Sequence, residues 1–392
     1  MERTQVGIVG AGPAGLLLAH LLHVEGIDSV ILEARAREYV EHRVRAGVCE
    51  HTTVGLLRDL GLAGRLDREG LPHEGFALRF DGADHRIDLA ALTGKSITVY
   101  GQQEIVKDLI EARLATGHGI EFEAADVALH DLESESPRIT WTDSSGVARE
   151  LRCDVIAGCD GFHGISRPTI PAGLLTSYDH TYPFAWLGVL AQTPPSSEEL
   201  IYARHERGFA LHSMRSPEIT RLYLQVDPGE RLDDWSDARI WDELATRFTL
   251  DGGFALREGP LLEKIITPLR SYVTETMRHG RLFLAGDAAH IVPATGAKGM
   301  NLAVADVRRL APALVALLRK NDSAAADGYA EQCLSRVWRA EHFSYFMTTM
   351  LHRAPGADPF TDRLQLSQLR YVASSTAAAT SLAENYVGLP FD

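Results

Sequence analysis

Three glycines between two apolar segments constrain this chain more than any other feature of its sequence. Gly10, Gly12 and Gly15 follow a short apolar run at 6–9 and precede a helical segment at 16–23. A second apolar run, 28–32, ends at the acidic Glu33. Strand, glycine turn, helix and acid-terminated strand are the parts of a dinucleotide-binding βαβ unit with parallel strands. A glycine-rich turn without a ligand is the alternative, and the flanking elements favour the dinucleotide.

Each glycine of the turn has its own physical reason. Gly10 permits the tight turn, Gly12 lets the backbone approach a pyrophosphate, and Gly15 lets helix and strand pack closely. The first helical turn, with Ala14, presents N–H groups and the positive end of the helix dipole to negative charge. Glu33 can then accept the ribose hydroxyls.

Two further turns of the same kind follow later in the chain. One, at 158–161, contains Asp160 and is followed by Arg167; the other, at 286–290, contains Asp287. A nicotinamide enzyme needs only one such turn. The three in this order resemble the single-component flavoprotein aromatic hydroxylases. The resemblance implies that Asp287 binds the ribitol of FAD, and that Asp160 and Arg167 lie where the flavin and nicotinamide pyrophosphates are handled.

The segment after the third turn predicts a helix over 300–318 with an exposed N-terminus. A helix dipole of ~0.5 charge at that end suits the pyrimidine side of a reduced flavin, which is negatively charged. Lys298 would add to this field, or would be an ordinary surface lysine. The cofactor contacts expected around this end are Pro293, Gly296, Lys298, Gly299, Met300 and Asn301.

Composition excludes several classes of protein. Hydrophobic residues make up 45% and charged residues 23%, which is the mixture of a globular protein rather than of a disordered, collagenous or coiled-coil chain. The net charge of −14 disfavours nucleic acid and anionic bilayers as partners. The longest apolar run, 311–318, is far shorter than the ~20 residues of a membrane span. Four cysteines without a Cys-x-x-Cys pair predict free thiols in a cytoplasmic protein and no metal site.

Five more segments narrow the resemblance to one family. They are 43–47, 182–184, 208–211, 234–237 and 384–390. Together they resemble the 4-hydroxybenzoate 3-monooxygenases over nearly the whole chain. That family converts 4-hydroxybenzoate, NAD(P)H and molecular oxygen into 3,4-dihydroxybenzoate (protocatechuate) and water through a flavin hydroperoxide. The resemblance implies a substrate site formed by Tyr202, Ser213, Arg215, Tyr223, Ala294 and Tyr386, with His73 further out.

The patterns and the resemblance together predict an α/β fold with three parts. A Rossmann-like FAD-binding domain of the glutathione-reductase type is expected over 1–72, 96–178 and 268–345. Strand-forming and aromatic residues predict an inserted, mostly antiparallel β substrate domain over 73–95 and 179–267, with a helix near 237–248. The remaining 346–392 is expected to be helical.

The chemistry of a benzoate independently favours Arg215 as its anchor. A guanidinium binds a carboxylate through two charge-assisted hydrogen bonds of ~1.5–3 kcal/mol each. Ser213 and Tyr223 supply neutral donors at strand spacing around it. The alternative is that Arg215 is a solvated charge.

The phenol end of the substrate requires a path for a proton. Phenols have a pKa of ~10, so ionising one at pH 7 costs ~4 kcal/mol. Tyr202 linked through Tyr386 towards His73 would carry that proton to water, and a histidine that titrates near neutrality suits the outer end. Without the family resemblance, Tyr202 and Tyr386 would be taken as core aromatics and His73 as a surface histidine.

Further flavin contacts rest on the resemblance. It places Arg45 on the flavin pyrophosphate, Gln102 on the flavin, and Arg221 where it stabilises the inward flavin position and the reduced anion. Arg43 is a further candidate. The alternative for Arg43 and Arg45 is a helix cap or a pair with an acidic neighbour.

Two departures from the family pattern matter. Many members have two prolines after Val292, whereas this chain has Pro293 and Ala294. The Ala294 carbonyl can still accept a hydrogen bond from the substrate hydroxyl, but the loop could admit a related substrate. In the segment at 34–39, which sets nicotinamide preference in the family, Glu38 together with Glu41 disfavours a 2′-phosphate. We therefore expect NADH as the electron donor, with NADPH also possible.

Alternatives within and outside this function remain open. A hydroxylase of a related para-substituted benzoate such as 4-aminobenzoate is one. A non-hydroxylating FAD oxidoreductase is another, and a flavin-binding sensor is a third. The resemblance suggests a homodimer. The aromatic and methionine side chains at 343–347 are compatible with its contact surface or with the core.

Overall fold

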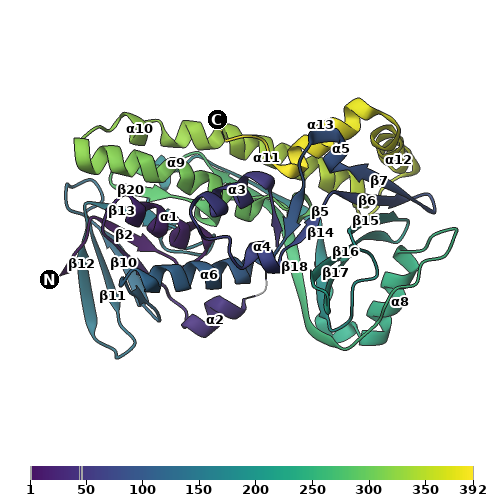
Figure 1. Ribbon diagram of the computed structural model, residues 1–392, viewed down its shortest axis with the longest axis horizontal. Helices are drawn as coiled ribbons and strands as arrows, with labels where there is room; N and C mark the ends of the chain where they lie inside the picture. Colours follow the sequence, from purple (N-terminus) through teal and green to yellow (C-terminus); the bar gives the residue numbers. More distant parts are fainter. Residues whose placement is uncertain (1, 44, 46, 392) are drawn as a thin grey trace.

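The computed structural model describes residues 2–43, 45 and 47–391, so Val44 and Ala46 of the family segment at 43–47 lie outside the described part. The chain forms two sheet-centred lobes, with long helices lying along both (Figure 1).

The first lobe contains the predicted parallel βαβ unit. Its sheet has the order β19-β20-β13-β2-β3-β9, and all its strand pairs are parallel except that of β19 with β20. The strands are β2 (Val6–Val9), β3 (Ser29–Leu32), β9 (Ile120–Glu121), β13 (Val155–Gly158), β19 (Arg278–His279) and β20 (Leu282–Leu284). Each of the three glycine turns therefore begins at the carboxyl end of one of these parallel strands.

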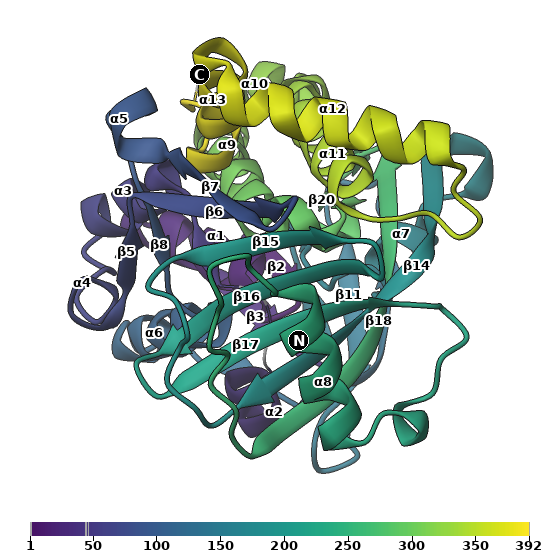
Figure 2. The same ribbon diagram turned by 90° about the vertical axis from the view of Figure 1, so that its right-hand side faces the viewer.

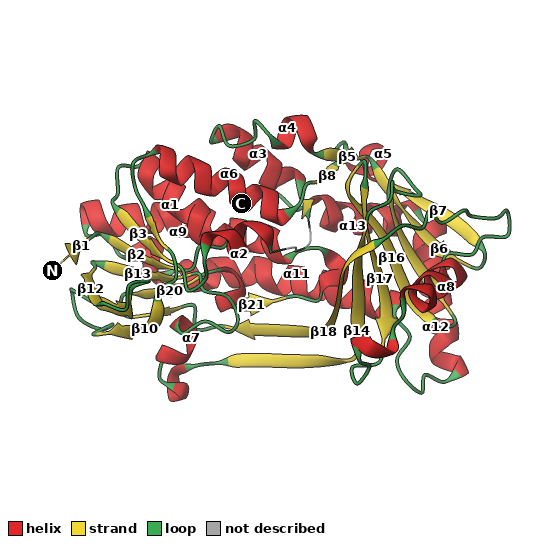
Figure 3. Cartoon of the chain, turned by 90° about the horizontal axis from the view of Figure 1, so that it is seen from below, coloured by secondary structure: helices red, strands yellow, loops and turns green. Residues whose placement is uncertain are grey.

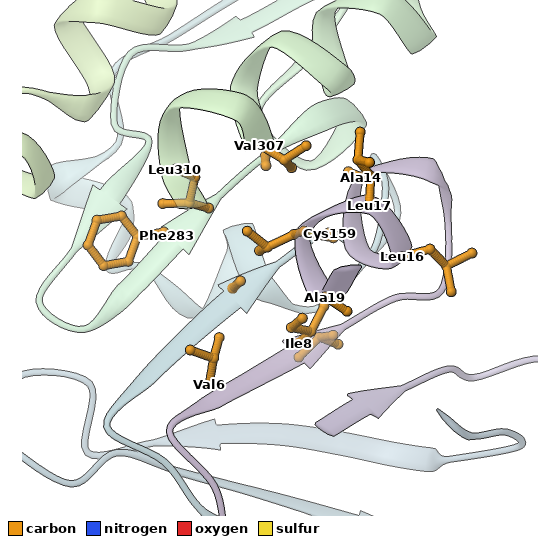
Figure 4. Close-up of a cluster of buried hydrophobic side chains, with 14 of the residues drawn as sticks. Val6, Ile8, Ala14, Leu16, Leu17, Ala19, Cys159, Phe283, Val307 and Leu310 are labelled. Atoms are coloured by element: carbon orange, nitrogen blue, oxygen red, sulfur yellow. The ribbon is translucent and has the colours of Figure 1, made fainter. Parts of the chain in front are cut away.

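Helices cover this sheet because its strands are apolar on both faces. Helix α1 (Pro13–Val24) packs against α6 (Gln102–Ala115) and α9 (Gly299–Lys320). Ile8 of β2, Leu17 of α1 and Leu310 of α9 lie in one buried cluster with Phe283 of β20 (Figure 4). This core fixes the distances between the three turns.

Two smaller sheets are also present, and the second of them contributes Val48, Ile97 and Val99 to the core that includes Phe76 and Tyr202. One has the order β1-β12-β11-β10, with strands β1 (Glu2–Arg3), β10 (Ala125–His130), β11 (Arg138–Thr142) and β12 (Ala148–Arg152). The other has the order β4-β8-β5, with strands β4 (Val48–Cys49), β5 (Leu71–His73) and β8 (Ile97–Val99).

The second lobe is an eight-stranded sheet of order β21-β18-β14-β17-β16-β15-β6-β7. Its strands are β6 (Gly75–Phe80), β7 (Ala83–Asp88), β14 (Ser177–Ala191), β15 (Leu200–His205), β16 (Gly208–Ser216), β17 (Ile219–Val226), β18 (Leu261–Thr274) and β21 (His290–Ile291). Most neighbours are antiparallel, as predicted, and β6 pairs with β15 in parallel. The antiparallel pair of β6 and β7 confirms the prediction for 74–89.

Helices lie on both faces of this sheet (Figure 2). Helix α8 (Asp237–Arg247) packs on one face, near the position predicted for it. Helices α11 (Tyr329–Leu351), α12 (Pro359–Ser374) and α13 (Thr376–Val387) form the expected C-terminal helical region and contribute to the core on the other face. The remaining helices are α2 (Arg37–His42), α3 (His51–Asp59), α4 (Leu66–Glu69), α5 (Leu89–Thr93), α7 (Ser166–Thr169) and α10 (Ala324–Asp327).

Four of the expected domain boundaries fall inside continuous elements, the first of them, at 72/73, within β5. The boundary at 178/179 lies within β14, that at 267/268 within β18, and that at 345/346 within α11. Strands β14 and β18 run from one lobe to the other as a long antiparallel pair (Figure 3). The lobes are thus joined by regular structure rather than by exposed linkers.

No helix in the described ranges is both long enough and apolar enough to cross a membrane.

Candidate active site

The first glycine turn leaves one side of its backbone open. Gly10 has a φ of +104°, and a Cβ there would clash with the carbonyl of Cys159. A Cβ on Gly15 would clash with the carbonyl of Gly10. A Cβ on Gly12, by contrast, would meet no described atom within 4 Å, although Gly12 is the N-cap of α1. Gly10 and Gly15 are therefore required by the fold, whereas Gly12 leaves space in front of the helix N-terminus.

We expect Gly12→Ala to separate folding from cofactor binding. Since the added methyl group meets no described protein atom, the thermal midpoint of the cofactor-free protein should change little. The same methyl group would occupy the space needed by a pyrophosphate, so FAD occupancy after purification should fall. Absorbance at the flavin band measured against protein concentration tests this. Gly15→Ala is the matched variant, and it should destabilise the protein itself.

Glu33 lies beside this turn, as predicted. Its Oε2 accepts a hydrogen bond from the Ala11 N–H at 2.8 Å, and its Oε1 accepts from the Arg35 N–H at 2.9 Å. The carboxylate is thereby fixed at the end of β3. Its contact with a ribose stays a prediction.

The second and third turns meet next to the first. Asp160 Oδ2 accepts from the backbone N–H and the hydroxyl of Ser166, at 2.8 and 2.9 Å. Its Oδ1 is buried without a hydrogen-bond partner among the described residues, and burial raises the pKa of this carboxyl group. Arg167 donates to the carbonyl of Ala288, 3.0 Å away and next to Asp287 in the chain. The structure thus brings Asp160, Arg167 and the Asp287 turn together.

Asp306, on α9, was not expected from the sequence to bear on the site. Its Oδ2 accepts from the Gly286 N–H at 2.8 Å, and it lies 2.6 Å from Nε2 of His290. Asp306 is buried, and it fixes the turn that presents Asp287, whose side chain is exposed to solvent. An acid eight residues into a helix gives no sequence signal, because its partners are backbone and side-chain groups of another segment.

The N-terminus of α9 differs from the prediction in its side chains. Lys298 is buried, not a surface lysine, and its Nζ donates to Glu50 Oε1 at 2.7 Å and to the Tyr386 carbonyl at 3.1 Å. Arg336 contacts the other oxygen of Glu50 at 3.3 Å. The charge of Lys298 is therefore largely balanced, and the field it adds at this helix end is weaker than expected.

Asn301 is expected as a cofactor contact, but its side chain makes hydrogen bonds to groups of the protein itself. Its amide donates to the carbonyls of Val48 and Ala297, each at 3.0 Å. Its carbonyl oxygen accepts from the Glu50 N–H and from the Thr53 hydroxyl, at 3.0 and 2.8 Å. Asn301 therefore ties the segment at 48–53 to α9. Of the other contacts expected here, Gly299 and Met300 form the first turn of that helix, and Gly296 is buried beside it.

Arg43 and Arg45 act on the third turn, since burial raises the pKa of Asp287 there and both cations oppose that rise. Arg43 follows α2 and is exposed, and Gln102 is the first residue of α6. The backbone carbonyl of Arg45 accepts from Arg215 Nη2 at 3.4 Å. Arg45 therefore lies beside the predicted substrate anchor.

Strand register places the predicted substrate residues on one face of the large sheet. Tyr202, Leu211 and Tyr223 are directly opposite one another on β15, β16 and β17. Ser213 is opposite Arg221 in the next position on that face. Because side chains alternate along a strand, a spacing of two residues keeps all of them on the same side. Gly188 of β14 is opposite Tyr223 on the other side of β17.

Two guanidinium groups on this face have unused donors. Arg215 donates to the Ser213 hydroxyl at 3.1 Å and to the Met214 carbonyl at 2.8 Å, but its Nε has no partner among the described residues. Arg221 is 4% exposed; its nearest acid, Glu263, is 3.7 Å away, and its Nε and Nη1 have no hydrogen-bond partner in the described ranges. Buried donors without partners carry a free-energy penalty that an anionic ligand removes.

The same cations act on Tyr223. Burial opposes ionisation of its hydroxyl, but Arg215 and Arg221 together outweigh burial and lower the pKa of Tyr223. The Arg215 Nη2 lies 3.5 Å from this hydroxyl. This end of the face is therefore electropositive and suited to a carboxylate.

Tyr202 and Tyr386 form the predicted pair at the other end. Their hydroxyl oxygens are 2.6 Å apart, and both side chains are at least 98% buried. Burial raises the pKa of both tyrosines above 10, so both are neutral at pH 7. Neutral hydroxyls can each donate one proton and accept another, as a relay requires.

His73 is not joined to this pair in the structure. It is 2% exposed, and neither ring nitrogen has a hydrogen-bond partner among the described residues. Burial lowers the pKa of His73 to about 4. The expectation of a solvent-facing histidine that titrates near neutrality is therefore wrong, because β5 places the ring in the interior. Water or a movement of the chain would have to connect it to Tyr386.

A cavity of about 520 Å³ lies outside this site. Arginine and acidic side chains line it, and they pair with one another, as Arg247 does with Glu243 at 3.2 Å. None of the predicted site residues lines it.

The fold and the site together define an FAD-dependent aromatic hydroxylase. A family profile described as "FAD binding domain" matches residues 3–344. The p-hydroxybenzoate hydroxylase of Acinetobacter baylyi is 48% identical over 391 residues, which cover 100% of this chain and 96% of that protein. The chain belongs to this family of FAD-binding aromatic monooxygenases.

Solved structures show the same fold at lower identity. The p-nitrophenol 4-monooxygenase PnpA of Pseudomonas putida superposes with a TM-score of 0.84 at 20% identity, with 100% of both chains covered. Aklavinone-11 hydroxylase in complex with FAD and aklavinone gives a TM-score of 0.76 at 22% identity, over 92% of this chain and 73% of that one.

Proposed function

We propose that this enzyme hydroxylates 4-hydroxybenzoate at the 3-position, giving 3,4-dihydroxybenzoate with NAD(P)H and molecular oxygen. One observation carries the proposal. One sheet face presents two guanidiniums with buried, unpaired N–H groups at one end and Tyr202, which bonds Tyr386 of α13, at the other. A para-hydroxylated benzoate has the matching groups, a carboxylate at one end of the ring and a phenol at the other.

Different residues of the chain act on the carboxylate end and on the phenol end of the substrate ring. Arg215, with Ser213 and Tyr223, binds the carboxylate and sets the position of the ring along the sheet. Tyr202 accepts a hydrogen bond from the substrate hydroxyl and passes the proton to Tyr386, 2.6 Å away. Removing that proton makes the ring electron-rich, and the electropositive face lowers the cost of doing so.

The residues present fit FAD. The free N-terminus of α1, the space at Gly12, the unpartnered Oδ1 of Asp160 and the exposed Asp287 form one row along the carboxyl ends of the parallel strands. These groups, with Glu33 and Arg45, would hold the dinucleotide. When bound, FAD takes electrons from the nicotinamide and activates oxygen. The surrounding apolar residues exclude water from the reacting ring.

A substrate panel tests the proposal directly. The FAD-loaded protein is given 4-hydroxybenzoate, 4-aminobenzoate, 3-hydroxybenzoate and benzoate, and NADH oxidation, product and peroxide are measured for each. The expected result is product from 4-hydroxybenzoate in near-equal amount to NADH consumed. Peroxide alone from every compound would contradict the proposal and favour a non-hydroxylating oxidoreductase.

A second candidate substrate, 4-aminobenzoate, is supported by Ala294. This residue is exposed at the start of the short helical turn 294–296, where the family resemblance implies a second proline. An alanine relaxes the restriction on φ that a proline imposes. The loop can then shift its carbonyl to accept from a donor of different geometry, and the panel compares the two compounds.

We expect NADH to be preferred over NADPH. Every residue of α2 is half-buried or exposed, and Arg37 on it is paired with Glu41 at 2.6 Å, while Glu38 is unshielded at the surface. A 2′-phosphate would therefore be repelled by Glu38, and Arg37 would not be available to bind it because it is paired with Glu41. The measurement is kcat/KM for each nucleotide. Glu41→Gln, which frees Arg37, should raise the value for NADPH relative to NADH. A large NADPH preference of the unmodified enzyme would refute the assignment.

We also infer a cytoplasmic homodimer. The four cysteines are free and buried, which fits a reducing compartment. On the outer side of α11, Trp338 and Tyr345 are 40% and 49% exposed, and Tyr178 of β14 is in edge contact with Trp338. Phe343 and Met347, by contrast, lie in the core. Light scattering of the purified protein tests the dimer.

A further inference from the structure

A stack of aromatic rings lies behind Tyr223 on the same sheet face. Trp186 of β14 is 4.8 Å from Tyr223, measured between ring centroids. The ring of His352, which caps the C-terminus of α11, is stacked on Phe209 at 4.2 Å and on Phe184 at 4.6 Å. Trp186 thus lies between Tyr223, beside the predicted substrate anchor, and His352 at the C-terminal end of α11.

His352 uses both ring nitrogens. Its Nε2 accepts from the indole N–H of Trp186 at 2.6 Å, so the proton of the neutral ring lies on Nδ1, which donates to the Thr348 carbonyl at 2.9 Å. The ring is 2% exposed, and burial lowers its pKa to about 3. A single tautomer is therefore present at neutral pH, and it fixes the ring at both edges.

The same turn of α11 reaches the loop at the phenol end. The hydroxyl of Thr348 lies 2.9 Å from the hydroxyl of Thr295, and both residues are completely buried. Thr295 follows Ala294, whose carbonyl is expected to contact the substrate hydroxyl. The last turn of α11 thus makes two contacts. His352 contacts Trp186, beside the predicted carboxylate anchor, and Thr348 contacts Thr295, beside the predicted phenol end.

We propose that His352 is a positioning residue for hydroxylation, which holds Trp186 and thereby fixes Tyr223 and Arg215 relative to the Ala294 loop. The inference rests on the proposed function, because it concerns the two ends of the same substrate site. His352 touches neither the substrate nor the cofactor. It acts by keeping the substrate ring aligned with the oxygen that attacks its 3-position. A displacement of ~1 Å there can lower the rate ~10²-fold.

The test compares two substitutions that remove different properties of the His352 side chain. His352→Phe keeps a flat ring but cannot accept from Trp186, whereas His352→Gln loses the ring but keeps an acceptor. We expect His352→Phe to lower the yield of dihydroxybenzoate per NADH about tenfold, with the difference released as peroxide. His352→Gln should recover most of that yield. Equal yields for His352→Phe and the unmodified enzyme, or equal losses in both variants, would overturn the proposal.

A double variant separates positioning from general destabilisation. If His352 acts through Trp186, adding His352→Phe to Trp186→Phe should change the yield less than twofold, whereas independent effects would multiply. Should His352→Phe not retain FAD, Thr348→Val decides the question. It removes the hydroxyl that bonds Thr295 and the Ser344 carbonyl, but it keeps the backbone carbonyl that holds His352. It should therefore lower the yield while the dissociation constant for 4-hydroxybenzoate stays unchanged. An unchanged yield in Thr348→Val would then refute the proposal.

The unmodified enzyme serves as the reference for both proposals. If it forms product from none of the para-substituted benzoates, the proposed function fails. The link between His352 and Trp186 is then read from the indole fluorescence, which should shift in His352→Phe and not in His352→Gln. If the enzyme forms product and the variants do not differ from it, only the positioning role fails.

Discussion

Replacing Arg215 with alanine should weaken 4-hydroxybenzoate binding by at least ~10²-fold while FAD stays bound. Two charge-assisted hydrogen bonds to a carboxylate contribute ~1.5–3 kcal/mol each, and every ~1.4 kcal/mol is a factor of ten. Arg221 remains in the variant, opposite Ser213 on the same face, and the predicted loss is the part of the affinity that it does not replace. The change in flavin absorbance on titration with substrate measures the dissociation constant.

Two controls make the Arg215 result specific. Arg215→Lys keeps the charge and should lose less affinity than Arg215→Ala. Arg370→Ala removes an exposed arginine that pairs with Asp81 at 2.6 Å, and it should leave substrate binding unchanged. An Arg215→Ala enzyme that binds 4-hydroxybenzoate normally would show that the carboxylate is anchored elsewhere, and Arg221 would be the next candidate.

Tyr202→Phe should leave substrate-stimulated NADH oxidation intact and divert most of it to peroxide. The phenylalanine fills the same space but cannot accept the substrate proton, so the phenol stays neutral at pH 7. Because ionisation at that pH costs ~4 kcal/mol, losing even half of the compensation slows hydroxylation by about 30-fold. Product and peroxide measured per NADH consumed give the partition directly.

Variants of other tyrosines test the relay itself. Tyr386→Phe removes the next hydroxyl in line, 2.6 Å from that of Tyr202, and should also uncouple oxidation from hydroxylation. Tyr182→Phe removes a largely buried hydroxyl that bonds Ser271 at 3.3 Å, away from the pair, and should have no effect on the partition. Normal coupling in Tyr202→Phe would contradict the assignment of the pair as a proton path.

Parts of the candidate site could be proposed from the sequence because their signals are local. Gly10, Gly12 and Gly15 are set by the geometry of one turn, and alternation along neighbouring strands places Ser213 and Tyr223 on one face. The errors are at residues whose environment comes from distant segments. Lys298 is neutralised by Glu50, 248 positions away, and His73 is desolvated by packing that no short window of sequence contains.

The sequence by itself determined the βαβ unit and, through its resemblance to a known family, the cofactor class. Backbone sterics and side-chain periodicity act within a few residues and do not depend on the rest of the fold. Only the tertiary structure decided that Tyr202 meets Tyr386 across 184 positions, that Asn301 is committed to the protein, and that α11 contacts both ends of the site. The charge state of a side chain and its hydrogen-bond partners depend on which atoms replace water around that side chain. Those atoms come from remote elements, whose packing and register only the tertiary structure gives.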